Sequence, residues 1–489
     1  MKLTRNCIQP WAFFQVHAGG MVQCCAVAND TDMGDFIIDH CQKTARGEPS
    51  DILDSPGLVR LREGLLSGNL RPMCRRCFFR PEELITTAEL ERRVRRHLGK
   101  RLPAGTGVDS LDLARSHAYS EMCISFTNRC NSRCVYCVQS VLADVNPYFK
   151  MDFPEEYAES TLEFFAAQGI DQIRSCVEGE PTVYRRWCEV TSAFKDRHPH
   201  IELYMTTNLS RRYSEKEIEL LARYKVLDIS CDTLDPDLYA RMRPGSNLSL
   251  VLDNLQRVKA KKADMGIRGT RISLHSVVSD ATWRTLDSLA DYAFANGFVP
   301  LLGYYEERPN SRAYREGLCR PLTAMPEAEQ AEARKSILRI REELLRRGYD
   351  LGEFIQGGLL CSLERNLDRR YNRFEPYDDN PLHRAFHRQC PSGSPDAHLD
   401  IVYDHDNIAY NGVLFARPGV SLRLEGFSAG HAVVREVSLY KKGCHSTKYD
   451  QAVLPGYRKT VAVSGGAFAY APQFAEGVEK ILLEVSEWW

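Results

Sequence analysis

The chain has 489 residues, of which 43% are hydrophobic and 26% charged, a composition typical of a globular protein with two to four domains. Its 64 basic and 65 acidic side chains give a formal net charge of -1, so nothing indicates a nucleic-acid partner. No apolar run approaches the ~20 residues that cross a bilayer, and Trp11–Val16 is too short for the core of a signal peptide. We therefore expect a cytoplasmic protein with no membrane partner.

The first 90 residues form one predicted segment with cysteines near both of its ends. Gly19-Gly20 predicts a tight hairpin turn between two short strands. Residues 56–68 place apolar side chains at helical spacing before a glycine, which predicts a helix. Cys74 and Cys77 follow that helix, and residues 91–117 are charged and linker-like.

From about residue 118 to 310, β-rich runs alternate with amphipathic stretches. The predicted strands are Met122–Thr127, Gln172–Cys176, Ile201–Thr206, Val226–Cys231, Thr270–Val278 and Val299–Tyr305. The predicted helices are Glu155–Gln168, Trp187–Arg197, Ser214–Tyr224, Leu250–Lys262 and Ala281–Asn296. This rhythm predicts an α/β fold with a parallel sheet, either open or closed into a barrel.

The rest of the chain changes character twice. Residues 326–348 predict a long charged helix, with proline near its start and glycine at its end. Residues 349–395 are irregular and polar, so 326–395 is expected to be a helical and irregular connection. After residue 396 the pattern is all-β, and we expect a small β-sandwich-like domain over 396–489.

Three cysteines stand on one loop directly after the first strand of the alternating region. The stretch FTNRCNSRCVYCVQS contains Cys130, Cys134 and Cys137. Thiolates are the usual protein ligands of iron–sulfur clusters, and three of them leave one iron of a cubane open. A structural zinc site would need a fourth ligand, and none stands beside this loop. The spacing therefore favours an iron–sulfur cluster.

This loop resembles the signature of the radical S-adenosylmethionine (radical SAM) superfamily. The resemblance implies a partial (βα)6 barrel, over 118–325, that holds a [4Fe-4S] cluster on the three cysteines. It also implies reductive cleavage of S-adenosylmethionine to a 5′-deoxyadenosyl radical, which abstracts a hydrogen atom from a substrate. Such an enzyme needs a reducing partner such as flavodoxin or ferredoxin.

Further motifs carry the same resemblance and imply contacts to the cofactor. Tyr136 stands where the family has an aromatic residue near the adenine. Gly179 and Glu180 are similar to part of the family's Gly-Gly-Glu-Pro, which contacts the methionine amino group, although Glu178 replaces the first glycine. Asn208 belongs to a motif that is similar to the family's Thr-Asn-Gly, with leucine following it in place of glycine.

Later strand ends complete the implied cofactor site. Ser230 and Asp232 would face the same side of a strand and suit the ribose hydroxyls. Arg243 aligns with the arginine for the methionine carboxylate, and Arg241 is the alternative. Each residue alone could be a strand-end cap or part of a solvated turn. Their order at the carboxyl ends of strands, where open α/β folds bind ligands, favours a site.

The cysteines of the first 90 residues form a second set. Their spacing resembles the SPASM-type auxiliary-cluster module of the same superfamily, which implies one auxiliary [4Fe-4S] cluster. A zinc site with four thiolates is the competing interpretation, and Cys24 is an alternative to Cys25. The module precedes the barrel here, whereas it follows the barrel in most relatives. The expected ligands are Cys7, Cys25, Cys74 and Cys77.

Three of the remaining cysteines lie beyond the core strands, where a substrate could approach. Any of Cys319, Cys361 and Cys390 could donate a hydrogen atom to a substrate radical, whereas most other cysteines are expected to be small buried residues. Further candidates for lining the pocket, with ordinary barrel packing as the alternative, are His275, Tyr304, Tyr305 and Glu306.

The expected reaction is epimerisation or dehydrogenation of a carbohydrate or glycan-containing metabolite. This expectation rests on two features. The cluster module occupies the amino-terminal region in place of a leader-peptide-binding domain, and a β-sandwich is appended. A peptide or protein maturase that forms a thioether, a carbon–carbon link or an epimer is the alternative. A non-catalytic metal-binding interaction protein is a more remote one.

Overall fold

A computed structural model describes the fold over residues 2–25, 33–70, 74, 84–99, 102, 109–137, 139–143, 150–175, 178–305, 311–349 and 354–355. It also describes the backbone of seven strands between residues 397 and 487. Among the predicted site residues, Cys77, Glu306, Cys361 and Cys390 lie outside the described residues.

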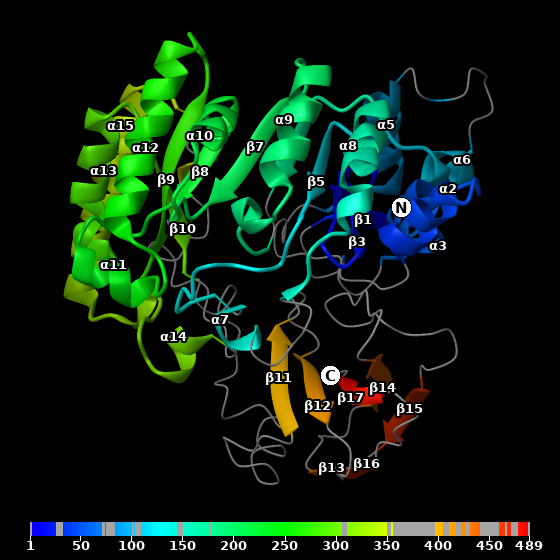
Figure 1. Ribbon diagram of the computed structural model, residues 1–489. Helices are drawn as coiled ribbons and strands as arrows, with labels where there is room; N and C mark the ends of the chain where they lie inside the picture. Colours follow the sequence, from blue (N-terminus) through cyan, green and yellow to red (C-terminus); the bar gives the residue numbers. More distant parts are fainter. Residues whose placement is uncertain are drawn as a thin grey trace. The chain divides into compact units, whose positions relative to one another are not determined.

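The main sheet has eight strands in the order β3-β2-β5-β6-β7-β8-β9-β10 (Figure 1). Its strands are β2 (Phe13–Val16), β3 (Val22–Gln23), β5 (Glu121–Ile124), β6 (Gln172–Ser175), β7 (Glu202–Thr207), β8 (Val226–Ser230), β9 (Arg271–Val278) and β10 (Val299–Tyr304). The pairs β7/β8, β8/β9, β9/β10 and β2/β5 are parallel, which confirms the predicted α/β class with a parallel sheet.

The sheet extends beyond the six predicted strands because β2 and β3 join it. The chain divides into two compact units, and each is described by itself. The first unit consists of Met1–Ser125, Met151–Ile173 and Glu375–Trp489, and the second of Phe126–Lys150 and Arg174–Phe374.

In the first unit, β2 and β3 form the predicted hairpin. The two strands pair antiparallel, and the amide of His17 donates to the carbonyl of Met21 across the turn. Gly20 has a φ of 89°, a left-handed conformation that glycine adopts without steric cost. A side chain at this position would also collide with Asp35, so both the backbone and the packing require glycine.

Short helices surround the hairpin, and one sequence expectation about them is wrong. The other described elements of the first unit, apart from the carboxyl-terminal strands, are β1 (Leu3–Arg5), α1 (Gln9–Ala12), a π-helix (Ile37–Gln42), α2 (Lys43–Ala45), a 3-10 turn (Ile52–Asp54), α3 (Pro56–Ser67), β4 (Leu84–Thr86), α5 (Thr87–Leu98), α6 (Ser110–Arg115), a 3-10 turn (Glu155–Tyr157) and α8 (Ala158–Ala167). The predicted helix at 56–68 is confirmed by α3. Residues 91–117 are not linker-like, because α5 and α6 occupy much of this stretch. Charged residues hide the apolar repeat of α5, whose Leu90, Val94 and Leu98 are buried four residues apart.

The second unit contains the helices that follow strands β6 to β10. They are α9 (Trp187–Arg197), α10 (Glu215–Ala222), α11 (Pro236–Met242), α12 (Leu248–Asp264), α13 (Leu286–Ala295) and α15 (Glu327–Arg346), with the shorter α7 (Gln139–Leu142) and α14 (Arg312–Arg315) and 3-10 turns at Pro181–Val183, Trp283–Thr285 and Leu322–Ala324. The bounds of α9 coincide with the prediction. The short α11 was not predicted, although Asp235 caps it by accepting from the amide of Leu238 at 2.8 Å.

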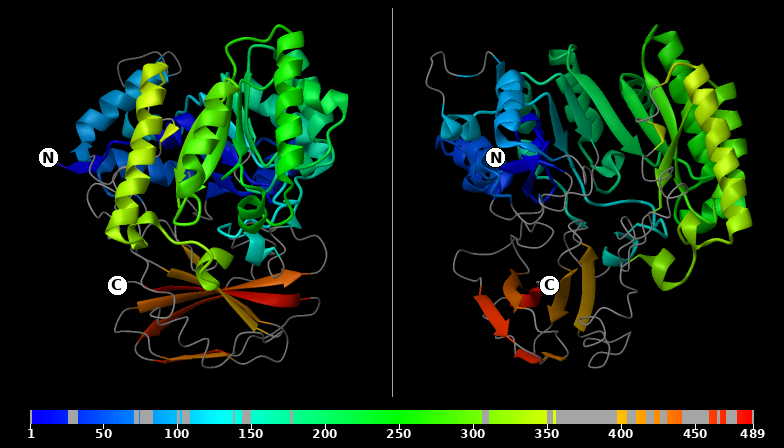
Figure 2. Two further views of the ribbon diagram at one scale, coloured as in Figure 1. Left: turned by 90° about the vertical axis from the view of Figure 1, so that its left-hand side faces the viewer. Right: turned by 180° about the vertical axis from the view of Figure 1, so that it is seen from behind.

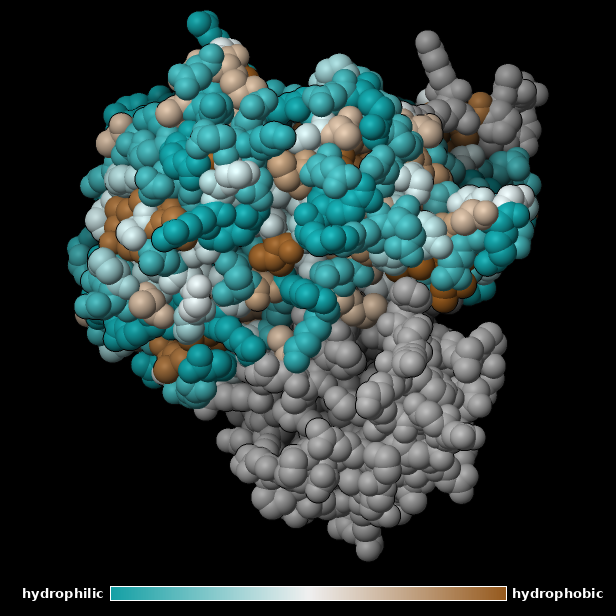
Figure 3. Space-filling model, viewed as in Figure 1, coloured by the Kyte–Doolittle hydropathy of each residue, from teal (hydrophilic) through white to brown (hydrophobic). Residues whose placement is uncertain are grey.

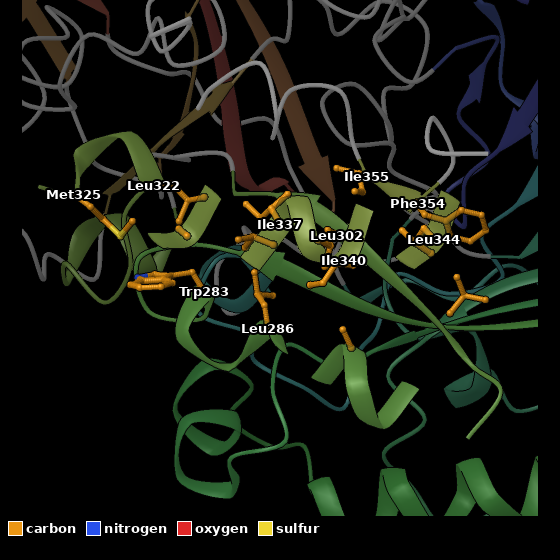
Figure 4. Close-up of a cluster of buried hydrophobic side chains, with 14 residues drawn as sticks. Trp283, Leu286, Leu302, Leu322, Met325, Ile337, Ile340, Leu344, Phe354 and Ile355 are labelled. Carbon is orange, nitrogen blue, oxygen red and sulfur yellow. The ribbon is translucent and has the colours of Figure 1, made fainter. Parts of the chain in front are cut away.

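An apolar cluster fastens α13 and α15 to β10. Ile337, Ile340 and Leu344 of α15 meet Leu286 of α13 and Leu302 of β10, all with no exposed surface (Figure 4). Burial of five such side chains stabilises this arrangement by several kcal/mol, at about 1.5–3 kcal/mol each. Figure 2 shows α12, α13 and α15 along one face of β8, β9 and β10.

The carboxyl-terminal strands are antiparallel where their pairing is described. β11 (Ala397–Tyr403), β12 (Tyr410–Ala416), β17 (Val478–Glu487), β14 (His431–Tyr440) and β15 (Lys459–Ser464) form a five-stranded sheet in that order, and β13 (Leu422–Glu425) pairs with β16 (Ala467–Tyr470). The strands agree with the all-β pattern after residue 396. Their packing as a sandwich stays a prediction, as does the division into four domains.

The described surface is mostly hydrophilic, with small scattered hydrophobic areas on the face in Figure 3. Among the described helices, none combines the length and the apolar character needed to cross a bilayer.

Candidate functional site

The three clustered cysteines lie on the loop that follows β5, at the start of the second unit. Cys130, Cys134 and Cys137 are each partly exposed and form no disulfide. The amide of Cys137 donates to the carbonyl of Cys134 at 3.0 Å, which closes a tight turn between them. The structure therefore presents all three thiols on one short, ordered loop.

Two glycines let other segments approach this loop closely. Gly179 has a φ of 72°, and a Cβ there would lie 2.6 Å from the carbonyl oxygens of Thr127 and Arg129. Gly245 has a φ of 87°, and a Cβ there would lie 2.8 Å from the carbonyl oxygen of Asn131. Such approaches are possible only without a side chain. Gly179 is therefore needed so that its segment can pack directly against the backbone of the cysteine loop.

The thiols influence one another electrostatically. Burial, reinforced by Glu180 and the other two thiols, raises the pKa of Cys130. Burial raises the pKa of Cys134 to about 11, although the nearby guanidinium of Arg243 opposes the shift. Without a metal, these two groups are protonated at neutral pH, so metal binding has to displace their protons.

Three thiols on one loop are a donor set that fits an iron–sulfur cluster. Among the described residues, no three His, Cys, Asp or Glu side chains converge on one metal ion. In a cubane each thiolate binds a different iron, so the ligand sulfurs stand further apart than around one ion. Three mutually interacting thiols on one loop, none of them in a disulfide, match that requirement.

Glu180 and Asn208 connect the loops that follow β6 and β7. Glu180 is 2% exposed, and its carboxylate accepts from the Thr207 hydroxyl and from the Asn208 amide, both at 2.7 Å. Burial raises the pKa of Glu180 although these hydrogen bonds oppose the shift. The side-chain amide of Asn208 donates to Asn131 at 2.8 Å and lies 3.8 Å from the sulfur of Cys130. The side chain of Asn208 therefore braces the cysteine loop, and Glu180 holds Asn208 in place.

Asp232, Arg243 and Tyr136 form a buried network. Arg243 donates to both carboxylate oxygens of Asp232, at 2.8 and 3.0 Å, and Tyr136 donates to the same carboxylate at 2.9 Å. A further guanidinium nitrogen of Arg243 lies 3.5 Å from the sulfur of Cys134. Sequence reasoning assigned Asp232 to the ribose and Arg243 to a carboxylate, whereas here the two bind each other. Their contacts to a cofactor stay predictions.

The remaining candidates of the second unit lie near this network. Ser230 is partly buried at the end of β8 and pairs in register with His275. Cys319 is 2% exposed in an apolar cluster with Val135 and Tyr305. Burial raises the pKa of Cys319 to about 12, so it is a neutral thiol whose role as a hydrogen-atom donor stays a prediction.

The described cysteines of the amino-terminal set lie in the first unit. Cys24 is completely buried, and its thiol lies 3.9 Å from the sulfur of Met33. A hydrogen bond with Cys25, burial and the charge of Cys74 contribute to raising the pKa of Cys24. Cys7, Cys25 and Cys74 are partly exposed. Cys24 is therefore a core residue, and Cys25 remains accessible to a metal, as the spacing from Gly20 favours.

Sequence reasoning did not identify one residue beside the site whose own backbone has an unusual conformation. Leu209 is the single described residue other than glycine with a left-handed backbone, at a φ of 51°. Leu209 stands where the family's Thr-Asn-Gly motif has glycine. The replacement of that glycine was the one sign in the sequence of this left-handed backbone. The carbonyl of Leu209 accepts from Asn254 at 3.0 Å, which stabilises the turn.

The fold and this site define a class: a parallel α/β domain with a three-thiol cluster loop beside the carboxyl ends of its strands. Residues 124–293 match the family described as the Radical SAM superfamily. The chain therefore carries a radical SAM domain.

Curated relatives match this part of the chain. The molybdenum cofactor biosynthesis protein moc-5 of Caenorhabditis elegans is 28% identical over 209 residues, covering 42% of this chain and 34% of the relative. The GTP 3′,8-cyclase of Nautilia profundicola is 28% identical over 194 residues, covering 39% and 57%. That of Marinobacter nauticus is 34% identical over 155 residues, covering 32% and 44%. The chain thus spans about a third to just over half of these proteins.

Two solved structures that match part of the chain contain bound S-adenosylmethionine. Streptococcus suis SuiB bound to S-adenosylmethionine has a TM-score of 0.38 at 16% identity and covers 61% of this chain and 67% of that one. The protein anSMEcpe with bound AdoMet has a TM-score of 0.37 at 18% identity and covers 50% and 66%.

Proposed function

We propose that Cys130, Cys134 and Cys137 hold a [4Fe-4S] cluster and that the chain cleaves S-adenosylmethionine reductively. The observation that carries this proposal is the set of three free thiols on one ordered loop of a radical SAM domain. Three thiolates leave one iron of a cubane for a further ligand. Such a cluster would supply one electron to bound S-adenosylmethionine, which would split into methionine and a 5′-deoxyadenosyl radical able to take a hydrogen atom from the substrate.

The chain's own residues prepare and shield the site. Gly179 and Gly245 fix the loop's backbone, and Asn208 and Arg243 direct N–H groups toward two of the cysteine sulfurs. The Asp232–Arg243 pair is almost completely buried beside Cys134. The guanidinium of Arg243 stands over the ring of Tyr136 at 5.4 Å, and we expect this ring to pack against the adenine of the cofactor.

The substrate that we propose is a carbohydrate or a glycan-containing metabolite, which loses a hydrogen atom in an epimerisation or dehydrogenation. A second candidate follows from the relatives named GTP 3′,8-cyclase. In that case the substrate is a purine nucleoside triphosphate and the product a cyclised nucleotide.

A second cluster is part of the proposal. Cys7, Cys25, Cys74 and Cys77 would supply four thiolates and close a [4Fe-4S] cube completely. The support is the electrostatic proximity of Cys24, Cys25 and Cys74 and the partial exposure of Cys7, Cys25 and Cys74. A small electron-transfer protein such as flavodoxin or ferredoxin would supply the reducing electron in the cytoplasm.

The test is the formation of 5′-deoxyadenosine by anaerobically reconstituted protein after reduction with dithionite. Sugars carrying deuterium at each carbon in turn, and likewise deuterated GTP, serve as substrates. Deuterium in the 5′-deoxyadenosine identifies the substrate class and the abstracted position. Absence of 5′-deoxyadenosine from protein with a full cluster contradicts the proposal.

A further inference from the structure

One face of the strands in the second unit carries a row of polar side chains. Asp228 of β8 is in register with Ser273 of β9, and one step further along Ser230 is in register with His275. Register partners point to the same face of a sheet, and so do residues two apart on one strand. All four side chains therefore lie on one face.

The opposite face of these two strands is apolar. Its residues are Leu227, Ile229, Ile272 and Leu274, and each is at most 7% exposed. Figure 2 shows helices α10, α12 and α13 along one face of β8 and β9. Apolar strand residues pack under covering helices, so the polar row lies on the face turned away from these helices.

Two atoms of the row are buried without a hydrogen-bond partner. Asp228 is 8% exposed and its Oδ1 accepts no hydrogen bond, and the Oγ of Ser273 is completely buried and forms none. The guanidinium of Arg271 lies 3.8 Å from this Oδ1, which is an ion-pair distance but too long for a hydrogen bond. Leaving such groups unsatisfied destabilises a fold, so they call for a ligand that supplies the missing donors.

We propose that Asp228 and Ser273 bind hydroxyl groups of a polyhydroxylated small molecule, with His275 extending the subsite, while Ser230 is left to the cofactor. This inference rests on the proposed function and names the residues that would hold its carbohydrate substrate. A hydroxyl donates to the carboxylate of Asp228 and can accept from or donate to the serine Oγ. One class of group therefore satisfies both orphaned atoms.

The charges around the row favour a neutral ligand over an ammonium group. Arg271 offsets the charge of Asp228, and the guanidinium of Arg174 stands over the ring of Tyr204 at 5.3 Å on the neighbouring strand. Burial, together with Arg243, lowers the pKa of His275. The neutral imidazole can donate at one nitrogen and accept at the other, which suits hydroxyls.

Space for the imidazole comes from the next strand. A side chain at Gly303 of β10 would collide with the Nε2 of His275. The ring therefore occupies the volume above a glycine, instead of being pressed against a bulkier neighbour. The ring of His275, a member of the polar row, therefore explains why this position of β10 is glycine.

The test compares Asp228→Asn and Ser273→Ala with Asp196→Asn, the same chemical change at a surface carboxylate whose side chain is 67% exposed. The probes are a panel of free hexoses and pentoses and their uridine diphosphate esters. Binding to reconstituted, S-adenosylmethionine-loaded protein is measured by calorimetry. We expect at least tenfold weaker binding for Asp228→Asn, a smaller loss for Ser273→Ala and no change for Asp196→Asn.

A second measurement separates the two levels of the proposal. Asp228→Asn should not lower the Tm, because a neutral amide costs less to bury than a carboxylate. If wild type forms 5′-deoxyadenosine but binds no sugar of the panel, or binds one as tightly as Asp228→Asn does, the subsite is wrong. The same holds if only a peptide binds. If no variant forms 5′-deoxyadenosine, the proposed function fails instead.

Discussion

The two cysteine sets differ in how the chain holds them. Cys130, Cys134 and Cys137 lie within eight residues on one loop, which two glycines and the side chains of Asn208 and Arg243 support. The amino-terminal set spans seventy residues, from Cys7 to Cys77, and draws on a hairpin, a helix and the stretch after it. A compact loop organises ligands before a metal arrives, whereas dispersed ligands depend on the fold around them.

This difference has a chemical consequence for the thiols. The loop cysteines are all partly exposed, whereas the dispersed set contains adjacent cysteines of opposite character, because Cys24 is buried and Cys25 is accessible. Spacing alone could not decide between these two residues. The packing of Cys24 against Met33 is consistent with Cys25 as the expected ligand, and that assignment stays a prediction.

The largest expected effect comes from removing the loop thiols. Replacing Cys130, Cys134 and Cys137 together by alanine should abolish 5′-deoxyadenosine formation and reduce the iron content from about eight to about four atoms per chain, since each cubane holds four. Iron and sulfide analysis of anaerobic protein measures this. Cys188→Ala, a partly exposed thiol on α9, is the control and should keep both.

Removal of one accessible thiol in the dispersed set should lower the iron content by the same amount, but at the other cluster. Cys25→Ala should lose about four irons and leave the loop cluster in place, because four thiolates are needed to close the auxiliary cube. Cys24→Ala should keep the iron and lower stability by roughly 1 kcal/mol through a small cavity. If Cys24→Ala loses the iron and Cys25→Ala keeps it, the assignment is reversed.

The support of the loop by glycine gives a smaller, structural effect. Gly179 and Gly297 have nearly equal φ angles of 72° and 74°, but a Cβ meets carbonyl oxygens only at Gly179. Gly297→Ala should therefore cost only the left-handed backbone penalty, about 1–2 kcal/mol. Gly179→Ala should cost more and also reduce iron at the loop. Urea unfolding and iron analysis of both variants separate the backbone penalty from the contact of the new Cβ with the carbonyl oxygens. Equal results for the two variants would mean that the close packing of Gly179 against the loop has no effect on stability or iron.

The sequence predicted much of the fold because its signals are local. Strands β6 to β10 lie within one or two residues of their predicted bounds, and the bounds of α9 agree completely. The helix α5 was missed because charged residues obscure its apolar repeat, and the joining of β2 to β5 is a pairing of distant segments that periodicity cannot show.

The candidate site was predictable in its residue types but not in its pairing. The cysteine loop follows from spacing alone. The contact between Asp232 and Arg243 joins residues that both looked like ligand-binding groups. Two side chains of opposite charge satisfy each other whenever the backbone brings them together, and that geometry is a property of the folded chain.

The last expected effect is on the pH dependence of stability and concerns Asp35, which faces the hairpin of the first unit. Its Oδ1 accepts from the amides of Ile37 and Ile38, at 2.9 and 3.0 Å, whereas its Oδ2 is buried without a partner. Burial raises the pKa of Asp35 from 3.8 to about 7. The folded state thus binds a proton that the unfolded state has released between these pH values.

Because the folded state holds the extra proton, its stability is greatest below pH 4 and falls as the pH rises toward 7. This group alone should lower the free energy of unfolding by on the order of 2–4 kcal/mol across that window. Asp35→Asn cannot titrate, so its unfolding free energy should lack this part of the pH dependence, and the difference between variant and wild type measures it. Asp51→Asn, at a carboxylate with 74% exposure, is the matched control. Equal pH profiles for wild type and Asp35→Asn would show that the pKa of this carboxylate is not raised by burial.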